Sequence, residues 1–354
     1  MVQQAERVAP AAAAEPSLQE WRHLYEAAIR AKELAPWDWM NEVDIFGVEN
    51  PETGDLGFVS VMGALGEHYA VGVYLGSWAL YEFWSLVEAG PKAPPERILE
   101  IPQLQASFED RTELRVEDRE IIKKLGLRFR GRGAWPLFRS WRPGFVPWYL
   151  EAHEARFLTT ALLQLLDVAP RFREDRSLLE ISDDDVYLVR ALRREGGAQV
   201  WEDRRVQVPP PPPRQIEIIL DQRLLQSLQK VTRSVAALEV DLSMIPEGMR
   251  DTPQERPYYA YNLLIVEPQS SFVLGTELLA PAPTLEAMWG QVPQRLAQQL
   301  LRVGILPEEI RVRSPLLRQL LQPLAQELGI RLKPVKSLRS LDSVQREMLS
   351  FLRR

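Results

Sequence analysis

The chain has 354 residues, with 43 Lys or Arg, 49 Asp or Glu, three His and no Cys. The absence of cysteine excludes disulfides, thiolate zinc sites, iron–sulfur clusters and cysteine nucleophiles. No apolar run approaches the roughly 20 residues of a membrane span, and the N-terminus lacks the pattern of a secretory signal. We therefore expect a cytoplasmic globular protein that does not enter a membrane, and the length suggests two domains.

The first half of the chain mixes helical and strand patterns without a regular rhythm. Residues 1–16 are small and polar, which predicts a disordered tail. Ser17 and Glu20 fit a capping box that opens a helix. Further strands are predicted at 43–48, 58–62, 69–75, 185–192 and 199–208 (the last two joined through Gly196 and Gly197), helices at 78–88, 115–125 and 151–168, and an irregular segment at 91–102. This mixture predicts an α+β domain over residues 17–208.

Five consecutive prolines at residues 209–213 separate the two predicted domains. Such a run donates no backbone hydrogen bonds and forms a stiff extended helix. A rigid spacer is the favoured interpretation, and a ligand for an aromatic groove of a protein partner is the other. The charge also changes at this point, from a net −9 over residues 1–213 to a net +3 over residues 214–354.

The second half has a clear order of predicted elements. A first helix is followed by the order β-β-β-α-β-α-β-α. The predicted ranges are helix 215–231, strands 237–244, 259–266 and 272–278, helix 284–303, strand 310–313, helix 316–328 ended by Gly329, strand 330–335 and helix 340–352.

Three stretches of this half carry a further pattern. They read EVDLS from Glu239, YYAYNLLIVEPQSSFVLGTELL from Tyr258 and VGILPEEIRVRSPLLRQLLQPLAQELGIRL from Val303. Together with the order of elements, they resemble the catalytic core of retroviral-type integrases and their transposase relatives. The resemblance implies an α/β ribonuclease H-like domain over residues 214–354. In such domains carboxylates hold two Mg²⁺ ions that activate water and stabilise the leaving oxygen.

The resemblance assigns catalytic and metal-binding roles to Asp241 on the first strand and Glu347 on the last helix. The middle position falls at Arg313 or its neighbours Val312 and Ser314, none of which is acidic. A guanidinium at this position cannot bind a metal and would repel one. Glu309 or Glu267 could supply a displaced carboxylate, whereas Asp241 and Glu347 could also be ordinary polar residues. The favoured hypothesis is a binding or regulatory protein without enzymatic activity, metal or cofactor. The alternative is a divergent Mg²⁺-dependent nuclease or strand-transferase.

A basic and aromatic stretch runs from Lys123 to Arg142, with seven basic residues and no acidic one. Such stretches can grip single-stranded nucleic acid, because bases stack on rings while guanidinium groups bind phosphates. The residues proposed for such contacts are Arg128, Arg130, Arg132, Trp135, Arg139 and Trp141. The other interpretation is that the aromatic residues belong to the core and the arginines are solvated or ion-paired. Because the surrounding half is net negative, we expect binding to nucleic acid to be weak or absent.

Several sequence segments along the whole chain show a second resemblance. WPLFRSWRPGFVPWYLEAHEARFLTTALLQLLDVA and YLGSWALYEFW resemble an uncharacterised bacterial family built on a domain of unknown function. ERPYYAYNLLIVE and LPEEIRVRSPLL resemble the partner domain commonly fused to it. This resemblance implies a two-domain protein and brings no activity or ligand with it.

One histidine stands beside two carboxylates. His153 lies between Glu151 and Glu154 at the start of a predicted helix. This arrangement could serve acid–base chemistry, but a polar first turn at the positive end of a helix is the commoner reason for it. The sequence therefore leaves both interpretations open.

Overall fold

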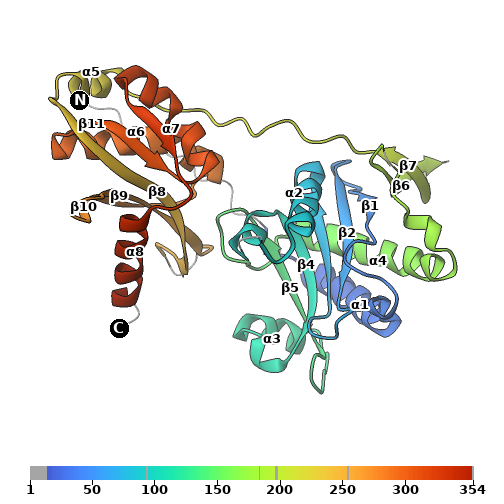
Figure 1. Cartoon of the computed structure of the whole chain (residues 1–354). Helices are drawn as coiled ribbons and strands as arrows, with labels where there is room; N and C mark the ends of the chain where they lie inside the picture. Colours follow the sequence, from blue (N-terminus) through green and yellow to red (C-terminus); the bar gives the residue numbers. More distant parts are fainter. Residues whose placement is uncertain (1–13, 93–94, 183, 196–197, 253–254, 353–354) are drawn as a thin grey trace, which may run out of the picture. The chain divides into compact units, whose positions relative to one another are not determined.

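A computed structural model describes residues 14–92, 95–182, 184–195, 198–252 and 255–352. The chain divides into two compact units. Unit 1 comprises Met1–Arg142 and Pro147–Pro212, and unit 2 comprises Pro143–Val146 and Pro213–Arg354. Each unit is mixed α/β and has its own mixed sheet (Figure 1). Most of the predicted tail and the predicted Gly196–Gly197 connection lie outside the described residues.

Unit 1 is built on a sheet with the strand order β5-β4-β3-β2-β1-β6-β7. Neighbouring strands are antiparallel, except that β1 and β6 are parallel. The strands are β1 (Phe46–Glu49), β2 (Leu56–Met62), β3 (Ala70–Leu75), β4 (Gln103–Glu109), β5 (Trp135–Trp141), β6 (Val186–Glu195) and β7 (Ala198–Gln207).

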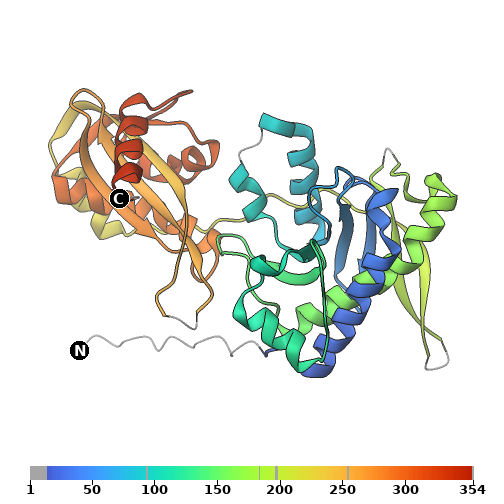
Figure 2. The ribbon, with the colours of Figure 1, turned by 90° about the horizontal axis from the view of Figure 1, so that it is seen from below.

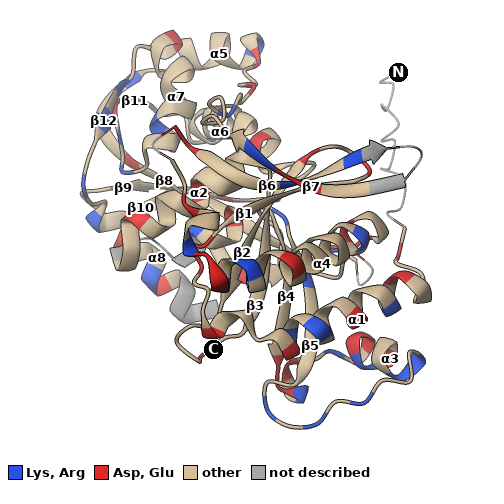
Figure 3. Ribbon diagram, turned by 90° about the vertical axis from the view of Figure 1, so that its right-hand side faces the viewer, with Lys and Arg blue, Asp and Glu red and all other residues tan. Residues whose placement is uncertain are grey.

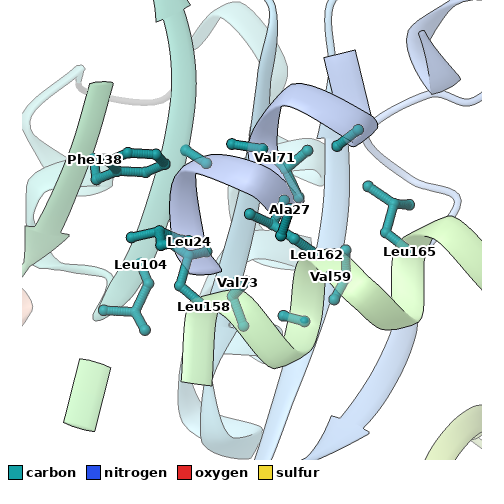
Figure 4. Packing of buried hydrophobic residues seen from close by; sticks show 14 of the residues in the cluster. Leu24, Ala27, Val59, Val71, Val73, Leu104, Phe138, Leu158, Leu162 and Leu165 are labelled. Atoms are coloured by element: carbon teal, nitrogen blue, oxygen red, sulfur yellow. The ribbon is translucent and has the colours of Figure 1, made fainter. Parts of the chain in front are cut away.

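Helices cover both faces of this sheet (Figure 1, Figure 2). They are α1 (Leu18–Leu34), α3 (Val116–Lys124) and α4 (Ala152–Glu174) on one face, and α2 (Gly76–Ala89) on the other. Alternation along the strands produces the two faces, because successive side chains point to opposite sides. Val59 of β2 packs with α1 and α4, whereas its neighbour Phe58 packs with α2. Figure 4 shows Leu24 of α1 and Leu162 of α4 in front of the strands.

Two strands of unit 1 were not predicted, and both lie at one side of the sheet. β4 follows the irregular segment and β5 lies inside the basic and aromatic stretch. β5 contains Pro136, which normally argues against a strand. It is nevertheless an edge strand, where a proline can point its missing donor away from the ladder. Its residues alternate between buried and half-buried positions, so its aromatic residues serve the core as well as the surface.

Unit 2 has the strand order β10-β9-β8-β11-β12, with β8 in the middle. β8 is antiparallel to β9 and parallel to β11, and β12 is parallel to β11. The elements are α5 (Gln222–Gln229), β8 (Arg233–Met249), β9 (Tyr258–Glu267), β10 (Phe272–Leu279), α6 (Leu285–Val303), β11 (Leu306–Val312), α7 (Pro315–Leu328), β12 (Arg331–Pro334) and α8 (Arg339–Leu352). α5, α6 and α7 pack on one face and α8 on the other.

The predicted helix over residues 215–231 is wrong in its first half, since α5 begins only at Gln222. The preceding residues run along α6, where the Ile219 amide donates to the Gly290 carbonyl at 2.9 Å. Ile216, Ile218 and Leu220 pack against the core of unit 2, and their spacing of two residues suits an extended segment. A Cβ on Gly290 would lie 2.1 Å from the Glu217 carbonyl oxygen, so a glycine permits this close approach.

The proline run is held at both of its ends. In unit 1, Val208 is buried, and its carbonyl accepts a hydrogen bond of 2.9 Å from the Tyr81 hydroxyl. In unit 2, Arg214 lies over the Trp289 ring at 5.1 Å and pairs with Glu286 at 3.0 Å. These contacts fix the residues that flank the run, and its role as a spacer stays a prediction.

Unit 2 also includes residues 143–146, a short segment from the first half of the sequence. Within unit 2, the Gly144 carbonyl accepts from the Tyr259 amide at 2.8 Å, and the Val146 amide donates to the Pro257 carbonyl at 2.9 Å. Residues 143–146 therefore pair with the start of β9 through an antiparallel bridge between Phe145 and Tyr258, although the sequence assigns them to the first domain. Their long separation from β9 along the chain hides this pairing from local patterns.

Candidate functional site

Asp241 lies on β8, the central strand of unit 2, and is almost fully buried. Leu238 and Val240 of the same strand face the core under α6 and α7. The intervening residues face α8, because Glu239 accepts from the Leu341 amide at 2.9 Å, and Ser243 accepts from Gln345 at 2.9 Å. The alternation of β8 thus brings Asp241 to the face that α8 covers.

Arg313 reaches the same place from the end of β11, the parallel neighbour of β8. Its Nη2 donates to Asp241 Oδ2 at 2.5 Å and its Nε donates to the same oxygen at 3.2 Å. Its Nη1 donates to Asp342 Oδ1 at 2.6 Å. One guanidinium therefore joins two carboxylates from different elements, and we call these three residues the arginine centre.

The three charged side chains of the arginine centre are buried to different degrees. The side chain of Asp241 is 5% exposed, whereas those of Arg313 and Asp342 are about one-third exposed. Burial works against the charge of Arg313, but hydrogen bonds and charges of Asp241 and Asp342 raise its pKa above the ordinary value. Arg313 therefore stays charged at every physiological pH and neutralises a carboxylate that water reaches poorly.

The other predicted carboxylates do not meet Arg313. Glu347 is exposed on α8, and the α8 carboxylate that reaches the centre is Asp342, which the sequence did not single out. Glu309 binds Arg311 at 2.8 Å and Arg331 at 2.6 Å. Glu267 accepts from the Gln269 and Ser270 amides in its own turn. The displaced ligands considered for a metal are thus engaged elsewhere.

The ion pairs of Glu309 with Arg311 and Arg331 make a pH-dependent contribution to stability that can be tested. The hydrogen bond from Arg311 and the charges of Lys333 and Arg331 lower its pKa, against the opposing effect of burial. Because the folded pKa is below the unfolded one, Glu309 stabilises the fold above about pH 4.3, and this stabilisation is lost as pH falls through the folded pKa. We expect Glu309→Gln to lose stability at pH 7 and to approach the wild type at pH 3, measured by urea unfolding. An equal loss at both pH values would contradict this.

The chemistry open to the arginine centre is limited by its composition. Across the described parts of the chain, no three His, Asp or Glu side chains are grouped so that they could hold a metal ion. A guanidinium has five donors and no lone pair for a metal. The arrangement instead ties β8, β11 and α8 together through charge-assisted hydrogen bonds.

The structure separates the residues of the basic and aromatic stretch. Arg139 is mostly buried and binds both oxygens of Asp118, at 2.9 and 2.7 Å, so it is an ion-paired residue. Trp141 is half-buried on β5. Arg132 is exposed and lies 3.8 Å from Asp110. The remaining three residues, Arg128, Arg130 and Trp135, line one pocket of unit 1.

A larger pocket of about 750 Å³ lies in unit 1 beside the first turn of α2. His153 and Glu154 line it. Glu154 is already engaged, because it accepts from Ser140 at 2.8 Å, from Arg142 at 3.0 Å and from the Glu151 amide at 2.8 Å. His153 is largely exposed, 3.6 Å from a Glu151 oxygen. These contacts are those of a polar first helical turn rather than of a paired acid and base.

Comparison with known proteins gives two domain matches. Residues 21–190 match the family described as Domain of unknown function (DUF7309), and residues 224–349 match the one described as Domain of unknown function (DUF6930). No curated protein matches the chain. The two matches cover the N- and C-terminal parts of the chain and are consistent with an uncharacterised two-domain family. In addition, no helix among the described residues is long and apolar enough to cross a membrane.

Proposed function

We propose that unit 2 is a ribonuclease H-like domain without a catalytic metal centre, and that the protein is a cytoplasmic binding or regulatory protein. The order of elements from β8 onward is β-β-β-α-β-α-β-α, which is the order on which the sequence resemblance rests. Asp241 on the first strand and an acidic residue of the last helix also converge beside the end of the fourth strand. This supports the fold assignment.

The position of Arg313 between Asp241 and Asp342 carries the proposal that the domain is non-catalytic. Two-metal catalysis requires carboxylate oxygens that converge on two cations about 3.5–4 Å apart. In this protein the fixed positive charge of Arg313 occupies the space between the carboxylates. A divalent cation would have to displace it against charge repulsion.

The alternative is a divergent Mg²⁺-dependent nuclease or strand-transferase that uses Asp241 and Glu347. It would need Arg313 to swing away and a third carboxylate to approach. Of these residues, only Asp241 contacts Arg313, together with Asp342 of the last helix. Release of Arg313 would leave Asp241 and Asp342 facing one space, and this is what makes the alternative testable.

Calorimetric titration with MgCl₂ and MnCl₂ tests the proposal. We expect no saturable binding that depends on Asp241, because Arg313 already neutralises this carboxylate. The matched variants are Asp241→Asn in the centre and Glu347→Gln on the exposed part of α8. Saturable Mn²⁺ binding that disappears in Asp241→Asn would overturn the proposal, and its loss or persistence in Glu347→Gln would show whether Glu347 is a second ligand. Metal-dependent cleavage of DNA or RNA that is lost in Asp241→Asn and in Glu347→Gln would establish the alternative.

A further inference from the structure

A basic pocket of about 600 Å³ lies in unit 1 beside α3 and the segment that leads towards β5. Arg119 and Lys123 line it from α3, Arg128 and Arg130 line it from the segment, and Arg111 is the fifth cation. The lining contains no acidic residue. Figure 3 shows Lys and Arg along the loop between α3 and β5. The pocket therefore concentrates positive charge within the first half of the chain, residues 1–213, whose net charge is negative.

Within the described residues, none of these five cations takes part in a salt bridge, although Arg111 lies over the Trp135 ring. Other arginines of unit 1 do: Arg156, for example, binds Glu20 and Glu52, and Arg190 binds Asp203. Bringing like charges together costs free energy, and an anion bound in the pocket would offset this cost.

The acidic residues of α3 do not offset this charge. Glu117 accepts a hydrogen bond of 2.8 Å from the Tyr149 hydroxyl, and Asp118 is held by Arg139. Glu120, the third acidic residue of α3, does not line the pocket. The face of α3 that carries Arg119 and Lys123 is therefore free to attract an anion.

The pocket also has an aromatic part. Phe129 and Trp135 line it and meet edge to face, with ring centroids 5.8 Å apart. Tyr25 supports Phe129 from α1 at 6.3 Å, and the Arg111 guanidinium lies 5.9 Å from the Trp135 ring. Aromatic rings that are held in place can stack with a planar base, while neighbouring guanidinium groups bind phosphate oxygens.

We propose that this basic pocket binds a phosphorylated nucleoside, with its phosphates on Arg128, Arg130 and the α3 cations and its base against Trp135. The volume is that of a small-molecule site. The net −9 of residues 1–213 repels a long polyanion but has less effect on a compact one, because salt screens charges beyond about 8–10 Å. This proposal goes beyond the function proposed for unit 2 and does not depend on the arginine centre.

Isothermal titration of the full chain with ADP, adenosine and a 12-residue single-stranded DNA tests the proposal. We expect saturable ADP binding that weakens between about 50 and about 200 mM NaCl. The Arg128→Ala/Arg130→Ala variant should bind ADP at least about tenfold more weakly, because it loses two charge-assisted contacts. Adenosine should also bind at least about tenfold more weakly, since it lacks phosphates. Trp135→Leu should weaken the binding of ADP but leave the affinity for inorganic pyrophosphate within about twofold of the wild type.

Arg132→Ala is the matched control, because Arg132 is a neighbouring exposed arginine that does not line the pocket. It should leave ADP affinity within about twofold of the wild type. Absence of saturable ADP binding, or equal binding by the double variant, would overturn the proposal. DNA binding more than about tenfold tighter than ADP, lost in the double variant and in Arg132→Ala, would assign the stretch to nucleic acid instead. Circular dichroism of each variant verifies that it is folded.

Discussion

Replacing Arg313 by methionine is expected to lower the free energy of unfolding of unit 2 by about 3–5 kcal/mol, the usual cost of leaving one member of a buried ion pair without its partner. Asp241 would remain almost fully buried without its counter-charge. Asp342, now unpaired, would lie close enough to add repulsion. Urea unfolding followed by circular dichroism measures the loss as a shift of the unit 2 transition.

A second substitution separates charge from packing at this centre. Asp241→Asn combined with Arg313→Met removes the buried charge that the single variant leaves behind. We expect the double variant to recover part of the stability, which is the signature of a direct coupling between the two residues. A loss below about 1 kcal/mol in Arg313→Met, as is typical of exposed pairs, would show that the arginine centre is not a structural tie.

Leu162→Ala is expected to destabilise unit 1 by about 2–5 kcal/mol, the range for removing a buried leucine side chain. Leu162 is fully buried at the middle of α4, where Figure 4 shows it in front of the strands. Its loss would leave a cavity between the helix and the sheet. The measurement is the midpoint of the unit 1 transition in urea.

The adjacent Leu163 is the control for this variant, because it belongs to the same helix but is 40% exposed. Leu163→Ala should change stability by less than about 0.5 kcal/mol. Since each unit has its own core, Leu162→Ala and Arg313→Met should shift different transitions. Equal effects of Leu162→Ala and Leu163→Ala would contradict the burial of one face of α4.

Local patterns predicted the elements whose ends are determined by nearby residues. The capping box at Ser17 and Glu20 is confirmed, with the Ser17 amide 2.7 Å from the Glu20 carboxylate. The helix end at Gly329 is confirmed too, in the left-handed conformation that favours glycine. The missed elements depend on distant partners. β5 exists because it pairs with β4, and residues 216–220 are extended because they pack on α6.

The candidate site was predicted only in part for the same reason. Asp241 and Arg313 could be found because each stands at a recognisable place in the order of elements. The acidic residue of α8 was taken to be Glu347 from its spacing, whereas the docking of α8 on β8 and β9 brings Asp342 to Arg313. Helical periodicity does not show how a helix is turned against a sheet.

The basic and aromatic stretch shows the same limit. Its arginines look alike in the sequence, yet Arg139 is neutralised by Asp118, 21 residues earlier. Arg128 and Arg130 have no such partner among the described residues. Only the tertiary structure distinguishes an ion-paired arginine from one that is free to bind an anion.

The most direct test of the central claim, that Arg313 occupies the place of a metal in unit 2, is thermal unfolding with and without millimolar MnCl₂. A cation that binds the folded state raises the melting temperature. We predict no Mn²⁺-dependent rise for the wild type and a rise for Arg313→Asp, in which a third carboxylate joins Asp241 and Asp342. A wild-type melting temperature that rises with Mn²⁺, and a rise that Asp241→Asn abolishes, would contradict the claim.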